Sequence, residues 1–168
     1  MLYGRGTWLI HMLRTMLHEA GGGTSDAVFF SALKGLLAGA PNHKVSTLDL
    51  QRAFEQVMPA SLGYEGKKSL AWFFDSWVNG NSIPQFSLQG VRMVSTAGGH
   101  VRISGVLVQN HGARDMVTAV PLYTVDAQGK TRFLAFVFAD DPKTEFTLMA
   151  PAGAMQVLLD PEETVLRR

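Results

Sequence analysis

Apolar residues follow a helical spacing in the first half of the chain and an alternating spacing in the second half. From Gly4 to about Asn79 they recur at the spacing that places them on one face of an α-helix. After Asn79–Pro84 (NGNSIP), short alternating runs are separated by turns rich in Gly, Asp and Pro, which is typical of β-strands. We therefore predict an α+β chain in which residues 1–83 form a helical part and residues 84–168 an all-β domain.

The helical part is predicted to contain about four helices. The first covers about residues 5–18, is stopped by the run Ala20–Gly23, and buries Trp8, Leu9, Met12, Leu13 and Met16. The second starts at Ser25 or Asp26, both good N-caps, and buries Phe29, Phe30, Leu33, Leu36 and Leu37. The third starts near Ser46, whose spacing to Asp49 is similar to a capping box. The fourth follows Ser69 and buries Leu70, Phe73, Phe74, Trp77 and Val78.

The second part is predicted to contain about seven short strands, at residues 85–94, 101–109, 116–125, 131–138, 144–149, 155–159 and 164–166. Gly105 interrupts the alternation in the second of them and indicates a β-bulge there. Short strands with frequent turns and no helices between them favour an immunoglobulin-like sandwich.

Composition excludes several classes of protein. The chain has 168 residues and a net charge of +1, and its Lys and Arg residues are scattered, so the basic patch of a nucleic-acid binder is absent. No apolar run approaches the roughly 20 residues that cross a bilayer, so no membrane segment is predicted. The chain has no cysteine, which excludes disulfides, thiol catalysis and cysteine-ligated zinc.

The sequence by itself contains no complete catalytic or metal-binding motif. Of its five histidines, His11 and His18 lie on one face of the first helix but about 10 Å apart along its axis, too far to share a metal. No G-x-S-x-G motif occurs. The glycine-rich run before the second helix leaves anion binding open, but no strand leads into it and no Lys follows, which favours a loop between helices.

The first residues carry a resemblance to a known family. YGRG at Tyr3–Gly6, followed by the apolar run TWLIHMLRTML, resembles the Y-x-K-G segment and helix of the gluzincin zinc aminopeptidases, the family of aminopeptidase N and leukotriene hydrolase. Later segments are similar to that family in the same order: VSTLDLQRAFEQV resembles a threonine-capped helix, and SLAWFFDSWVNGNSIPQF resembles an F-F-x-x-W segment that leads into a β-domain. The chain departs from the pattern at Gly4, at Arg5, which replaces Lys, and in an insertion, GYEGKK.

The resemblance implies a role for Tyr3 as the catalytic residue that donates a hydrogen bond to the oxyanion formed during peptide hydrolysis. It implies that Gly6 lets this helix lie close to a neighbour, and that Trp8, Leu9 and Met12 are packing residues. The family holds zinc with H-E-x-x-H and a later Glu. The chain has no such motif, since HEAGG at His18–Gly22 lacks the second histidine. We expect no metal or other cofactor in this chain, zinc in a full-length parent enzyme, and no activity of the chain alone.

Two interpretations remain open after the sequence. In the first, the chain is the C-terminal fragment of such an enzyme, its partners are the missing N-terminal part of the catalytic domain and a peptide substrate, and it exposes the face of the first helix that carries Trp8 and Met12. An exposed apolar face would favour self-association. In the second, the chain is a stand-alone, non-enzymatic binding or scaffold module, and that face is covered within the chain or by a second copy.

Overall fold

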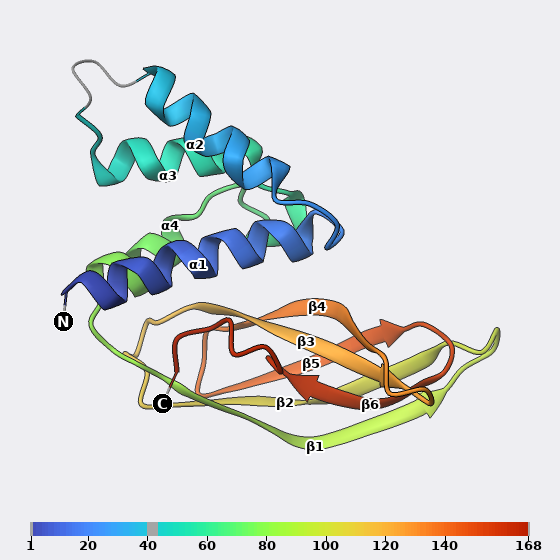
Figure 1. Ribbon diagram of the computed structural model, residues 1–168. Helices are drawn as coiled ribbons and strands as arrows, with labels where there is room; N and C mark the ends of the chain where they lie inside the picture. The colour runs from blue at the N-terminus through green and yellow to red at the C-terminus, as the bar shows by residue number, and fades with distance from the viewer. Residues whose placement is uncertain (1, 40–43, 168) are drawn as a thin grey trace. The chain divides into compact units, whose positions relative to one another are not determined.

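The computed structural model describes residues 2–39 and 44–167, with the side chains of Leu2 and Tyr3 excluded (Figure 1). The chain divides into two compact units, Met1–Asn79 and Gly80–Arg168. In the described residues, four α-helices precede six antiparallel strands, which confirms the predicted α+β class. The helices are α1 (Leu2–Ala20), α2 (Ala27–Gly39), α3 (Thr47–Val57) and α4 (Ala71–Phe73).

The glycine run ends α1 through its backbone geometry. Gly22 has a φ of +100°, a backbone angle that residues other than glycine rarely adopt. The Gly23 N–H donates to the His18 carbonyl at 2.8 Å, and the Gly22 N–H donates to the Glu19 carbonyl at 3.1 Å. These two bonds form a Schellman motif, which satisfies the last carbonyls of the helix.

Helices α2 and α3 lie side by side (Figure 1), with the rings of Phe29 and Phe54 5.4 Å apart. Phe29 is 4% exposed and Phe54 is fully buried. The predicted apolar stripe on α2 is wrong at Phe30 and Leu37, which are 51% and 67% exposed. Helix α2 therefore buries a narrower face than the spacing of its apolar residues indicates.

The predicted capping box at the start of α3 is confirmed. The Ser46 hydroxyl accepts a hydrogen bond from the Asp49 N–H at 3.2 Å, and the Asp49 carboxylate accepts one from the Ser46 N–H at 2.9 Å. Both bonds satisfy backbone donors that have no partner inside a helix. A short 3₁₀ turn, η2 (Ala60–Leu62), follows α3.

The predicted fourth helix is divided between α4 and a π-helical segment, η3 (Phe74–Asn79). The wider π turn accompanies the burial of three neighbouring aromatic residues, since Phe73, Phe74 and Trp77 are each 2% exposed or less. Val78 was predicted on the buried side, but it is 37% exposed.

Unit Gly80–Arg168 is a β-sandwich of two three-stranded sheets. One sheet has the order β1 (Gln85–Ser95), β2 (Val101–Asn110), β5 (Lys143–Ala150), and the other has the order β4 (Thr131–Ala139), β3 (Thr118–Asp126), β6 (Ala154–Leu159). All pairings are antiparallel. Its fully buried apolar side chains include Ile103 and Leu107 of β2, Val120 and Leu122 of β3, and Ala139 of β4.

Two details of the strand prediction are wrong. The bulge lies in β1 between Gln89 and Arg92, opposite Gly105 rather than at it. The seventh strand does not form, because the buried carboxylate of Asp160 accepts hydrogen bonds from the N–H groups of Thr164 and Val165 at 2.8 and 3.0 Å. The N–H groups of Thr164 and Val165 are thereby held in a local turn instead of a sheet.

Candidate functional site

Tyr3 occupies the first turn of α1, where the backbone is helical. Its side chain lies outside the described part of the structure. By helical spacing, position 3 falls on the same side of α1 as Thr7, Ile10 and Arg14. These three side chains are exposed, Ile10 to 37%. Thr7, Ile10 and Arg14 thus mark a side of α1 that the described residues leave exposed.

Arg5 joins the two segments that carry the family resemblance. Its Nη2 donates a hydrogen bond to the backbone carbonyl of Trp77 at 3.0 Å, in a partly buried position 72 residues away in the sequence. Trp77 is fully buried in η3. The sequence identified both segments but did not indicate that they touch.

The face of α1 that was predicted to pack is only partly covered. Leu9 and Met12 are buried, at 8% and 3% exposure, whereas Trp8 is 36% exposed and contacts His11 edge-on at 5.9 Å between ring centres. The expected close neighbour at Gly6 is absent from the described residues, since a Cβ built there would meet no atom within 4 Å.

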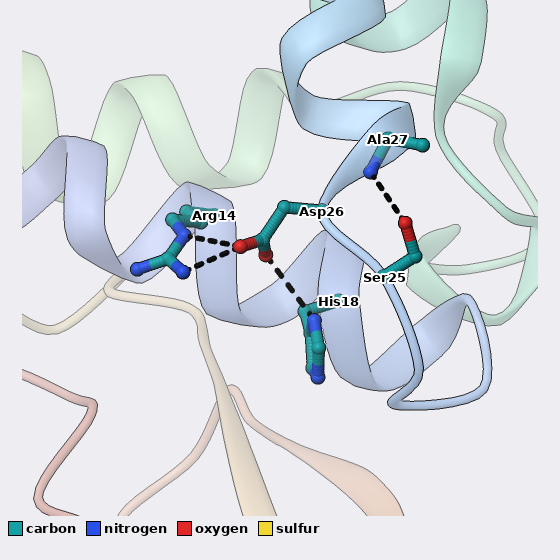
Figure 2. Close-up of polar contacts among 5 residues, drawn as sticks. All are labelled: Arg14, His18, Ser25, Asp26 and Ala27. Atoms are coloured by element: carbon teal, nitrogen blue, oxygen red, sulfur yellow. Dashed lines mark hydrogen bonds and ion pairs between the residues drawn. The ribbon is translucent and has the colours of Figure 1, made fainter.

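A carboxylate at the start of α2 binds two side chains of α1, as Figure 2 shows. The Nε of Arg14 donates to the Oδ2 of Asp26 at 3.0 Å, Nη2 of Arg14 donates to the same oxygen, and Nδ1 of His18 lies 3.2 Å from Oδ1. Ser25 caps the Ala27 N–H at 3.1 Å. The hydrogen bond from Arg14 is the main cause that lowers the pKa of Asp26. Partial desolvation opposes this effect, and the positive charge of Arg14 and the contact with His18 add to it.

This cluster ties the end of α1 to the start of α2 and belongs to the helical framework. The sequence offers Asp26, with Ser25, as an N-cap, but its pattern does not indicate that the loop brings Asp26 to Arg14 and His18. The side chains of Arg14, His18 and Asp26 are 48%, 31% and 20% exposed, so water reaches all three.

A groove of about 540 Å³ lies between α2 and α3. Gly35 and Gly39 line it, and a Cβ built at either position would meet no atom of the described residues within 4 Å. Lys44, Arg52 and Asp49 line it. The hydrogen bonds from Ser46 to the Oδ2 atom of Asp49 are the main cause that lowers the pKa of Asp49, and the positive charge of Arg52 adds to this effect. Because charges of both signs line the groove, it offers no concentrated charge of one sign.

The described residues do not fit a zinc ion. Among them, no three His, Asp or Glu side chains gather closely enough to hold a metal. His43 lies outside the described residues. The same part of the chain contains no helix that is both long enough and apolar enough to span a bilayer.

Comparisons with protein-family models and with curated proteins find no match for this chain.

Proposed function

We propose that this chain forms the C-terminal part of a gluzincin-type zinc aminopeptidase, with Tyr3 as its one catalytic residue. The contact between Arg5 and Trp77 carries the proposal. It brings together the YGRG segment and the F-F-x-x-W segment, which are the two most specific elements of the resemblance. The order of capped helix, aromatic turn and β-sandwich supports the same assignment.

Tyr3 would act through its hydroxyl group. When water attacks a peptide carbonyl, the carbonyl oxygen gains negative charge, and a phenol O–H directed at that oxygen stabilises it. A donor in such a place contributes about 3–4 kcal/mol, or roughly 10²–10³ in rate. The metal that supplies an activated water, and the acidic group beside it, would be held by an H-E-x-x-H segment, a motif that does not occur in the sequence of these 168 residues.

The β-sandwich is a structural domain in this proposal. Two antiparallel three-stranded sheets, with the buried residues of β2 and β3 at their centre, are compatible with an immunoglobulin-like sandwich. Assignment to that fold is part of the proposal.

The decisive experiment is made on the complete enzyme. Reading the coding sequence upstream of Met1 should give an in-frame H-E-x-x-H. Tyr3→Phe should then lower kcat by about 10²–10³ and leave the zinc content unchanged. Tyr64→Phe, in the same unit but outside α1, is the matched control and should retain normal turnover. An undiminished kcat in Tyr3→Phe, or peptide hydrolysis by the 168-residue chain alone, contradicts the proposal.

A non-enzymatic scaffold module is the second candidate, and the burial of Met12 favours it. Met12 is 3% exposed, so this part of the α1 face is covered within the chain. A scaffold of this kind should be a monomer at micromolar concentration by sedimentation, whereas an interrupted catalytic domain should self-associate through the face of α1 that carries the exposed Trp8.

A further inference from the structure

Arg5 stands where its own helix does not favour a cation. It lies in the first turn of α1, and that turn contains no acidic residue. The N-terminal end of a helix carries partial positive charge, so a guanidinium there is unfavourable unless another group attracts it. The sequence position of Arg5 therefore requires a compensating partner.

The C-terminal end of η3 is that partner. Trp77 lies two residues before the last residue of η3. The last carbonyl groups of a helix receive no hydrogen bond from an N–H group of the same helix. They carry partial negative charge and attract Lys and Arg side chains. Trp77 is fully buried, which fixes its carbonyl in place, and Arg5 donates to it at 3.0 Å.

The contact fixes the end of a helix that would otherwise fray. The first N–H groups of a helix have no partners inside it, and terminal turns open at low free energy. Leu9 is the first buried apolar residue among the described side chains of α1. Before Leu9, the hydrogen bond of Arg5 to the Trp77 carbonyl connects the first turn of α1 to η3.

We propose that Arg5 is a positioning residue for Tyr3: it anchors the first turn of α1 to the C-terminal end of η3 and so sets where the phenol stands. This inference rests on the proposed function for its catalytic consequence, but the anchoring itself is independent of any activity. A lysine in its place would keep a cationic donor at this position.

The anchoring is tested by hydrogen exchange on the 168-residue chain. Arg5→Met removes the donor but keeps most of the aliphatic stem. It should raise the exchange rates of the amides of residues 6–9 about tenfold, the effect of losing a hydrogen bond to a charged group. Arg5→Lys should restore slow exchange. Arg14→Met, on the same helix but bonded to Asp26, should leave residues 6–9 unchanged. Equal exchange in Arg5→Met and the native chain overturns the inference.

The catalytic consequence is tested on the complete enzyme. Arg5→Met should lower kcat about tenfold to a hundredfold, as misplacement of a catalytic group does, with KM and zinc content retained, and Arg5→Lys should recover kcat. In a Tyr3→Phe background, Arg5→Met should cause no further loss, because it acts through the phenol. An equal loss in both backgrounds overturns the positioning role. A normal kcat in Tyr3→Phe refutes the proposed function and leaves the exchange result standing.

Discussion

The ring of Phe146 lies against the backbone of Gly105, so that a Cβ built on Gly105 would stand 3.0 Å from Cζ of the ring. The two residues are paired across β2 and β5, and Phe146 is 8% exposed. Carbon atoms in good contact are about 3.5–4.0 Å apart. The missing side chain at Gly105 therefore makes the space that the phenyl ring fills.

Gly105→Ala should destabilise the chain by about 1–3 kcal/mol, the usual effect of overpacking a core. The new methyl group would also stand 3.3 Å from the carbonyl oxygen of Gln89, which as backbone cannot move freely. The φ angle of Gly105 is outside the left-handed region, so the effect is purely steric. Urea unfolding measures it, and an unchanged transition midpoint would show that the ring moves aside without loss.

Gly35→Ala is the matched control and should change stability in the opposite direction. Gly35 lies inside α2, and a Cβ there would meet nothing within 4 Å. Alanine favours a helix over glycine by about 0.5–1 kcal/mol, partly by restricting the unfolded chain. The same urea experiment should give a gain of this size. A loss of stability would mean that the space beside Gly35 is occupied in the folded protein.

The features that the sequence predicts are those whose causes lie close together along the chain. The Ser46–Asp49 capping box depends on two residues within one turn, and the glycines after Ala20 act on their own backbone. The contacts of Arg5 with Trp77 and of Phe146 with Gly105 depend on packing between distant segments, so periodicity cannot reveal them.

The missing seventh strand and the π-helical segment are also not visible in the sequence pattern, although the contacts at Asp160 are local. The segment after β6 has strand-like residues, but its Thr164 and Val165 N–H groups donate to the carboxylate of Asp160 instead of to a neighbouring strand. In η3 the aromatic spacing also fits an α-helix, so the sequence pattern does not distinguish the π-helical turn in which Phe74 and Trp77 are buried. The catalytic role of Tyr3 remains a prediction from the sequence.

Asp160→Asn should destabilise the chain by about 2 kcal/mol. The native carboxylate is fully buried and accepts hydrogen bonds from the Thr164 N–H, the Thr164 hydroxyl and the Val165 N–H. Asparagine keeps the shape and tolerates the φ of +40°, but its amide group cannot accept at both ends. Hydrogen bonds to charged groups contribute about 1.5–3 kcal/mol.

Chemical denaturation and amide exchange at residues 164 and 165 measure the loss in Asp160→Asn. Thr164→Val is the matched variant, since it removes the hydroxyl donor and leaves both backbone donors in place. It should lose less stability than Asp160→Asn. An equal or larger loss in Thr164→Val would show that the side-chain hydroxyl, and not the backbone N–H groups, holds this turn.

Thr118→Val should leave stability unchanged or raise it by up to about 1 kcal/mol. Thr118 is fully buried at the start of β3, and its hydroxyl has no hydrogen-bond partner among the residues that the structure describes. A buried hydroxyl without a partner is unfavourable, and valine has nearly the same shape without it. Thr118→Ser, which keeps the hydroxyl and removes the methyl group, should destabilise. Thermal unfolding of both variants gives the comparison, and a clear loss in Thr118→Val would reveal a hidden partner for the hydroxyl.

Asp26→Asn should reduce the dependence of stability on pH in acid. The hydrogen bond from Arg14 lowers the pKa of Asp26 in the folded chain below its ordinary value of 3.8, against the opposing effect of desolvation. The folded state therefore binds this proton less readily than the unfolded state. The resulting stabilisation is complete above 3.8 and disappears as the pH falls through the lowered pKa. The difference in unfolding free energy between native chain and Asp26→Asn should be largest near neutral pH and shrink in acid.

Arg14→Met should remove most of the same pH dependence, because the guanidinium of Arg14 is the main cause of the lowered pKa of Asp26. A difference between native chain and Asp26→Asn that stays constant through this pH range would mean that the Arg14–Asp26 pair is equally formed in the unfolded chain.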